Sequence, residues 1–254
     1  MEARRSVSRA ALAALGMALL LDLLVATWWR EQDLTAARIP VILMDALPND
    51  CRQVLLVLSP ERPSVRARFW LLERAPSGAW KALDLSRPVN LGWHGLAWGR
   101  ETVPRPAPPS WPTKQEGDGC SPAGVFPLTF AFGYAEATEA HWLRLPYRPL
   151  TDTLFGVDDP RSHYYNQVVD ATQVSADWDS AELMHRPDEL YSWGAYVAHN
   201  ADQFPGAGSC IFLHVWSGQG QGTAGCTAMA LEDMKRVLAW LDPAAHPHLV
   251  QWVE

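Results

Sequence analysis

Charged residues are scarce in this sequence, and Lys and Arg form no run or stripe. Asp, Glu, Lys and Arg together make up 19% of the 254 residues, and the formal net charge is −7. The lack of a basic patch excludes the usual electrostatic footprint of a nucleic-acid-binding protein. Hydrophobic residues reach 48%, which is too many for an intrinsically disordered chain. The composition therefore predicts a folded domain with a sizeable core and no nucleic-acid partner.

Cysteine is sparse as well. The four cysteines are Cys51, Cys120, Cys210 and Cys226, and their spacing matches neither a zinc ribbon nor a paired Cys-x-x-Cys motif. In an exported protein they could form up to two disulfides, but only one if a cysteine is reserved for chemistry. Cys210 begins a strongly apolar segment and is expected to be a buried thiol. We therefore expect Cys226 to be free and a bridge, if any, to join Cys51 to Cys120.

The first thirty residues have the pattern of an export signal. Arg4, Arg5 and Arg9 precede an apolar run at residues 10–27. The run approaches the roughly 20 residues that span a bilayer, so an uncleaved anchor that holds the chain at the inner membrane stays open. Asp22 opposes a permanent span, because an acid at the centre costs about 2.5–3.5 kcal/mol. Residues 1–30 are thus predicted to be an export signal or membrane anchor, and residues 31–50 a linker.

Short apolar segments bounded by turn residues fill most of the remaining chain. Together with 13 tryptophans and 20 prolines, they favour a β-rich body with long loops rather than a helical bundle. Strands are predicted at residues 53–58, 65–73, 79–83, 125–132, 194–199, 211–216 and 249–253. Residues 103–119 are predicted to form an irregular loop. Residues 149–190 show no clear period, and a long segment without structure in a compact domain tends to be functional.

One helix is predicted near the C-terminus, at residues 231–241. Its apolar positions fall on one helical face, and Asp242-Pro243 ends it. The expected fold is therefore one mainly β domain with a single helix packed on it.

Cys226 is the candidate nucleophile. It lies between the Gly-rich turn at residues 218–222 and the expected start of the helix. Gly225 lets the backbone turn tightly and a substrate approach closely. A helix N-terminus favours thiolate over thiol, and the backbone N–H groups of Gly225 and Cys226 could hold an oxyanion. A thiol is mostly protonated at neutral pH, so it also needs a base.

His214 is the candidate base, because it lies near the end of the predicted strand at residues 211–216. A short Gly-rich loop then leads to Cys226, and this can bring the two side chains together. His199 and Asn200 end the strand expected beside that of His214. They could line the cleft or simply pack, and both interpretations stay open.

These residues resemble the catalytic domain of the L,D-transpeptidase family (YkuD type). The family pattern is a His at a strand end, a loop, Ser/Thr-x-Gly-Cys, a hydrophobic residue and an Asp. The matching residues are His214, Thr223, Gly225, Cys226, Met229 and Asp233. The resemblance is strongest to a branch with long inserts, and its further matches lie at residues 116–119, 122–127, 157–160, 164–166 and 198–200. It covers residues 51–254, and it implies a β-sandwich or barrel with one helix and long loops.

The resemblance also implies a reaction on peptidoglycan stem peptides in the periplasm or cell envelope. Cys226 would attack the carbonyl before the terminal D-alanine of a tetrapeptide stem, whose third residue is typically a diamino acid. His214 would take the thiol proton and later protonate the leaving amine. The resulting thioester would pass to an amine, which gives a cross-link, or to water, which gives L,D-carboxypeptidase activity. No metal or organic cofactor is implied.

Two positions depart from the family pattern. Ala224 and Ala228 stand where many members carry His and Arg, which puts details of substrate contact in doubt more than the nucleophile. The resemblance also suggests that Thr223, Tyr165 and Asn166 belong to the substrate cleft.

Two further alternatives stay open. The chain could be a non-catalytic wall-binding domain that keeps the fold. It could instead hold zinc through His199, His214 and Cys226.

Overall fold

The computed structural model describes residues 44–101 and 105–254. The predicted export segment and most of the linker lie outside these residues. Within the described part, no helix is long and apolar enough to cross a membrane. The protein is mainly β, with 36% strand and 7% helix, and the fold class predicted from the sequence is confirmed at that level.

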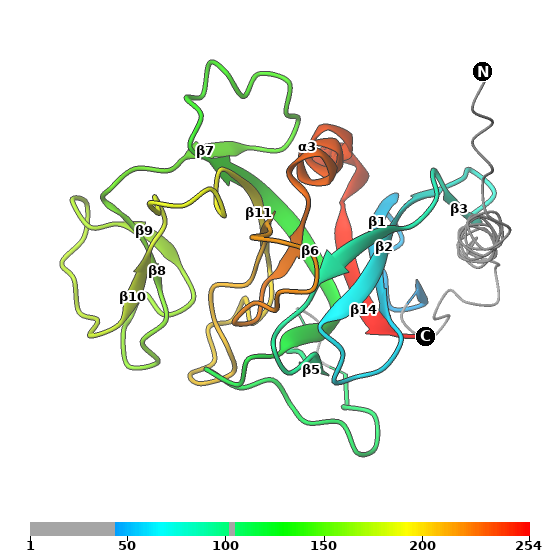
Figure 1. Ribbon diagram of the computed structural model, residues 1–254, viewed down its shortest axis with the longest axis horizontal. Helices are drawn as coiled ribbons and strands as arrows, with labels where there is room; N and C mark the ends of the chain where they lie inside the picture. Colours follow the sequence, from blue (N-terminus) through cyan, green and yellow to red (C-terminus); the bar gives the residue numbers. More distant parts are fainter. Residues whose placement is uncertain (1–43, 102–104) are drawn as a thin grey trace, which may run out of the picture.

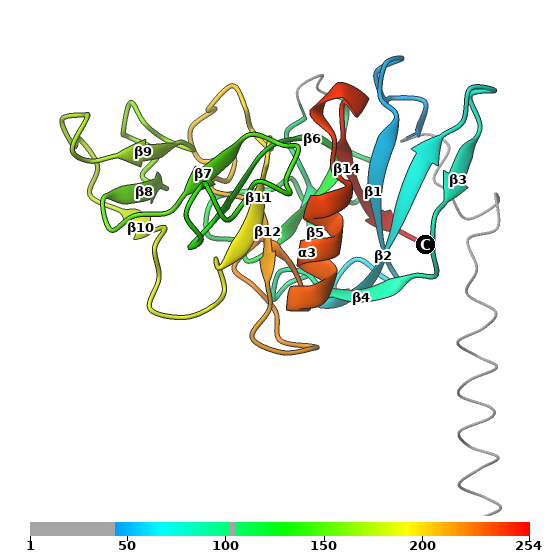
Figure 2. The same ribbon diagram turned by 90° about the horizontal axis from the view of Figure 1, so that it is seen from above.

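Eight strands close into a barrel (Figures 1 and 2). Around the barrel they are β1 (Gln53–Ser59), β14 (His248–Val253), β6 (Ser121–Gly133), β11 (Trp193–Val197), β12 (Phe212–Val215), β13 (Thr227–Met229), β4 (Arg87–Asn90) and β2 (Arg66–Arg74). β2 pairs back to β1 and closes the ring. β3 (Trp80–Ala82) extends β2, and β5 (Leu96–Trp98) and β7 (Tyr147–Pro149) pair with β6.

β1 is buried along its whole length. All seven of its residues are buried, as expected for a continuous apolar run in a strand that is covered on both faces. It pairs in parallel with β14 and antiparallel with β2. The helix α3 (Leu231–Trp240) follows β13 and contacts β11 and β12 (Figure 2). Met234, Val237 and Leu238 are fully buried on its inner face, where the apolar periodicity predicted them. The short 3-10 turn η2 (Pro243–Ala245) then leads into β14.

A second, three-stranded sheet lies at one end of the molecule (Figure 1). Its strands are β8 (Leu154–Val157), β9 (Val168–Asp170) and β10 (Ala181–Leu183). The expectation that residues 149–190 lack regular structure is therefore wrong. Strands of three or four residues are too short to show an alternating period, which explains why the pattern did not reveal them.

All four cysteines are free. Cys226 is a free thiol as predicted, but the expected bridge between Cys51 and Cys120 is not formed. Cys51 lies just before β1, with Sγ 3.4 Å from the Gln53 carbonyl. Cys120 lies just before β6, with Sγ 3.7 Å from the His94 carbonyl. Burial raises the pKa of Cys51 to about 11 and also raises that of Cys120, so both thiols stay protonated at neutral pH.

Candidate active site

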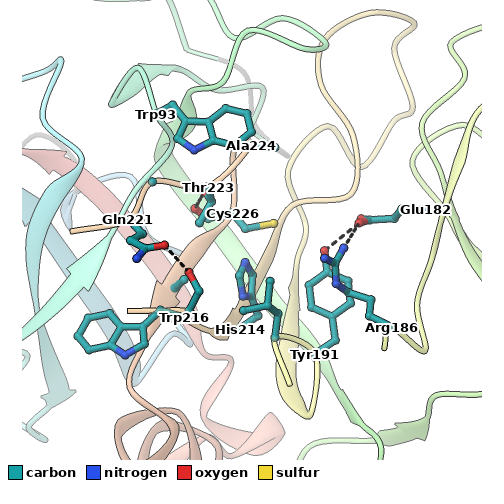
Figure 3. Close-up of a pocket in the computed structure, with 14 residues that line it drawn as sticks. Trp93, Glu182, Arg186, Tyr191, His214, Trp216, Gln221, Thr223, Ala224 and Cys226 are labelled. Atoms are coloured by element: carbon teal, nitrogen blue, oxygen red, sulfur yellow. Dashed lines mark hydrogen bonds and ion pairs between the residues drawn. The ribbon is translucent and has the colours of Figure 1, made fainter. Parts of the chain in front are cut away.

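Two neighbouring strands bring His214 and Cys226 to one cavity. β12 and β13 run parallel, with His214 opposite Ala228, and Cys226 is the residue just before β13. Both side chains line a cavity of about 280 Å³ (Figure 3). The strand-end histidine and the cysteine after the Gly-rich loop thus line the same cavity, although among the described residues no hydrogen bond joins them.

The protonation of His214 follows from its hydrogen bond. Nδ1 lies 2.7 Å from the Val215 carbonyl oxygen, which can only accept, so Nδ1 carries the proton and Nε2 keeps its lone pair. Burial lowers the pKa of His214 to about 4. The imidazole is therefore neutral at pH 7, which is the form that a general base requires.

The Cys226 thiol is held in the protonated state. Burial, followed by the negative charge of Glu182, raises its pKa to about 12. Sγ accepts a hydrogen bond from the Phe212 N–H at 3.3 Å and donates towards the Cys210 carbonyl at 3.6 Å. Within the described residues no hydrogen bond joins it to His214. The resting pair is thus a neutral thiol beside a neutral imidazole.

The helix does not activate this thiol. The sequence placed Cys226 at the helix start, but β13 intervenes and α3 begins only at Leu231. The field of a helix end acts mainly within its first turn. The short strand was missed because Thr227–Met229 continues an apolar run into the helix without a break in its pattern.

Thr223 fixes the loop that carries Cys226. Its Oγ1 donates to the Cys226 carbonyl at 2.6 Å and accepts from the Gly225 N–H at 3.2 Å. Ser121 Oγ donates to the same Cys226 carbonyl at 3.0 Å. The expectation that the Gly225 N–H is free to hold an oxyanion is therefore wrong in this conformation, because Thr223 occupies it. The N–H of Cys226 is the remaining main-chain candidate.

Four other residues predicted near the cleft do not line the cavity. Tyr165, Asn166, His199 and Asn200 are buried, with at most 3% of their surface exposed, and none of them lines the cavity. Both ring nitrogens of His199 lack a hydrogen-bond partner among the described residues. The other three form a polar network that fixes the turn before β12. Tyr165 and Asn166 therefore do not have the cleft position that the resemblance suggested. Of the two interpretations left open for His199 and Asn200, the structure favours packing.

The far wall of the cavity was not predicted. It includes Glu182 of β10 and, after that strand, Arg186 and Tyr191. The Tyr191 ring packs edge-on against His214, with ring centroids 5.3 Å apart. Trp93 and Trp216 line other parts of the cavity, and Trp93 is 60% exposed. Nothing in the local pattern of residues 181–191 indicated this role, since the small sheet positions it through long-range pairing.

The buried histidines predict a loss of stability at acid pH. Burial lowers the pKa of His199 to about 3 and of His214 to about 4, and it also lowers that of His248. The unfolded chain takes up protons near pH 6.5, while the folded chain does not. The free energy of unfolding should therefore fall as pH drops from 7 towards 4. Urea unfolding followed by tryptophan fluorescence would measure this.

Glu182 opposes that trend, because burial raises its pKa to about 7. Its contribution to stability is present at low pH and is lost as pH rises from about 4.5 to 7. Glu182→Gln should therefore steepen the dependence on pH. A Glu182→Gln variant that is as stable at pH 5 as at pH 7 would contradict the assignment of neutral, buried histidines.

The described residues contain no group of three or more His, Cys, Asp or Glu side chains that could hold a metal ion. The alternative zinc site is thus not formed, because His199 lies outside the cavity that His214 and Cys226 line and packs edge-on against Phe126. Comparison of the chain with protein-family models, curated proteins and solved structures gave no match.

Proposed function

We propose that the protein is a cysteine acyltransferase that acts on peptidoglycan stem peptides in the cell envelope, as an L,D-transpeptidase does. The observation that carries this proposal is the placement of Cys226 and a neutral His214 on adjacent parallel strands at one cavity. A buried thiol beside an unprotonated imidazole nitrogen is suited to nucleophilic catalysis. The likeness of the sequence to the family pattern supplies the substrate class.

The first half-reaction would form a thioester. His214 Nε2 takes the proton of the Cys226 thiol, and the thiolate attacks the carbonyl that precedes the terminal D-alanine. The N–H of Cys226 would stabilise the oxyanion of the tetrahedral intermediate. His214 then gives its proton to the departing nitrogen, the C–N bond breaks, and D-alanine leaves with a free amino group.

The second half-reaction would release the acyl group. An amine of a neighbouring stem attacks the thioester, His214 takes the proton that this amine loses, and the C–S bond breaks. The proton returns to Cys226, and an amide cross-link has formed. Water in place of the amine would give a tripeptide, which is the carboxypeptidase alternative.

Intact-mass spectrometry tests this proposal. After incubation with disaccharide tetrapeptide, the protein should gain the mass of the substrate minus D-alanine, and cross-linked dimers should accumulate in solution. Cys226→Ser is the control and should carry no thioester. Tripeptide without dimers would favour the carboxypeptidase. Absence of both adduct and D-alanine release would contradict the proposal and favour a non-catalytic wall-binding domain.

A further inference from the structure

The cavity wall facing Cys226 carries an open ion pair. In Figure 3 the sulfur of Cys226 points towards the side on which Tyr191, Arg186 and Glu182 lie. Arg186 Nη1 is 4.0 Å from Glu182 Oε2, which is too far for a hydrogen bond. About a third of each side chain is exposed, 32% for Arg186 and 29% for Glu182. The two charges therefore face the cavity without closing on each other.

The remaining contacts fix both groups and leave one atom of each unused. Arg186 Nε and Nη2 are bound to the Asp188 carboxylate at 2.8–3.2 Å. Glu182 Oε2 accepts the Tyr191 hydroxyl at 3.0 Å. Among the described residues, Arg186 Nη1 and Glu182 Oε1 make no hydrogen bond. One donor nitrogen and one acceptor oxygen are thus held in place by their neighbours and left for a ligand.

A charged group in this position is costly without a partner. Burial raises the pKa of Glu182 to about 7, because the carboxylate has lost water and gained only one neutral donor and a distant guanidinium. A ligand ammonium group would favour the ionised form of Glu182. A ligand carboxylate would accept a charge-assisted hydrogen bond from Arg186 Nη1. The wall is therefore complementary to a group that carries both charges close together.

We propose that Glu182 and Arg186 form the subsite for a zwitterionic amino-acid centre of the substrate, with Glu182 binding its ammonium group and Arg186 its carboxylate. This proposal rests on the proposed function. In a stem peptide, the side-chain end of a diaminodicarboxylic acid at the third position is such a centre. It belongs to the residue whose carbonyl Cys226 attacks, and it is absent when that position holds lysine.

The subsite is coupled to the reacting groups through Tyr191. The Tyr191 hydroxyl holds Glu182, and its ring packs against the ring of His214. The charge of Glu182 also raises the pKa of Cys226. A bound ammonium would offset that charge and so favour the thiolate only when substrate is present.

Binding to the Cys226→Ala protein tests the subsite independently of turnover. The ligands are three tetrapeptides that differ only at the side-chain end of the third residue. In the first peptide this end carries a free amine and a free carboxyl. In the second peptide the carboxyl is amidated, and in the third the amine is acetylated. Calorimetry should show dissociation constants at least about tenfold weaker for both modified peptides, the scale of one lost hydrogen bond to a charged group.

Two variants that each add one substitution to Cys226→Ala test which residue binds the carboxylate and which binds the ammonium group. Arg186→Gln should remove the discrimination against the amidated peptide, and Glu182→Gln the discrimination against the acetylated one. Glu182→Gln keeps an oxygen that can accept from Tyr191, so it should fold even if Arg186→Gln does not. Glu189→Gln removes an exposed acid from the same segment and should change neither preference.

Equal affinity for the three peptides, no measurable binding, or discrimination against the acetylated peptide that survives Glu182→Gln would overturn the subsite. Discrimination in binding without turnover by the wild-type protein would instead contradict the proposed function and leave the subsite supported. The two proposals can therefore fail separately.

Discussion

Cys226→Ala is expected to lower kcat for the tetrapeptide by about 10⁴-fold or more, because the covalent route disappears with the thiol. His214→Ala should cause a loss of similar size. The pKa of Cys226 is raised to about 12 and that of His214 is lowered to about 4, so the resting pair holds almost no thiolate at pH 7. His214 therefore has to take the proton as the thiol attacks the substrate carbonyl. The double variant should be no slower than either single variant, since the two groups act as a unit.

The measurement is release of D-alanine by quantitative mass spectrometry, with folding checked by circular dichroism. Cys51→Ala is the matched control. Cys51 is a fully buried thiol just before β1, outside the cavity, and its loss should leave turnover unchanged. A folded Cys226→Ala protein that keeps a tenth or more of wild-type activity would show that another group is the nucleophile.

The barrel strands that the sequence predicted are those with continuous apolar runs. β1, β2, β6, β11, β12 and β14 each overlap a predicted segment, and α3 lies within one residue of its predicted bounds. In each case a local pattern, alternation or helical periodicity, coincides with the buried face. The placement of His214 and Cys226 at one cavity was predictable for a related reason. A strand end and a short Gly-rich loop restrict where the next residues can lie.

The rest of the site depends on contacts distant in sequence. Glu182 reaches the cavity because β10 pairs with β8. Tyr191 reaches it because the chain turns back there into β11. Strands of three or four residues are too short to show either arrangement as a local pattern in the sequence. The expectation that the helix N-terminus favours the Cys226 thiolate was wrong for a similar reason. The three residues of β13 separate Cys226 from α3, and their composition cannot be distinguished from that of a helix start.

Asn166 was predicted to lie at the cleft, but it is buried and lies outside the cavity that Cys226 lines. Its Nδ2 donates to the carbonyls of His199 and Asn200 at 2.9 and 2.8 Å, and its Oδ1 accepts from the Cys210 N–H at 2.9 Å. Asn166, Asn200 and Cys210 all have positive φ, of 59°, 51° and 52°. One side chain therefore fixes three strained positions by hydrogen bonds, and Cys210 is the residue whose carbonyl lies 3.6 Å from the Cys226 sulfur.

Asn166→Asp is therefore expected to lower the free energy of unfolding by about 3 kcal/mol or more at pH 7, although it changes the shape of the side chain very little. Two donated hydrogen bonds are lost, and a carboxylate oxygen then faces two carbonyl oxygens in a buried site. Burial should raise the pKa of the new acid in the folded state, so the deficit should grow as pH rises from about 4 to 7.

Urea unfolding at several pH values measures that deficit, with Asn49→Asp as the control for the same change at an exposed position. Asn166→Gly separates the hydrogen bonds from the backbone, because glycine adopts positive φ without strain and yet makes none of the contacts. If the network holds the wall behind the nucleophile, Asn166→Gly should lose turnover by Cys226 even under conditions where it remains folded. An Asn166→Asp protein within about 1 kcal/mol of wild type at pH 7 would show that these contacts do not stabilise the turn.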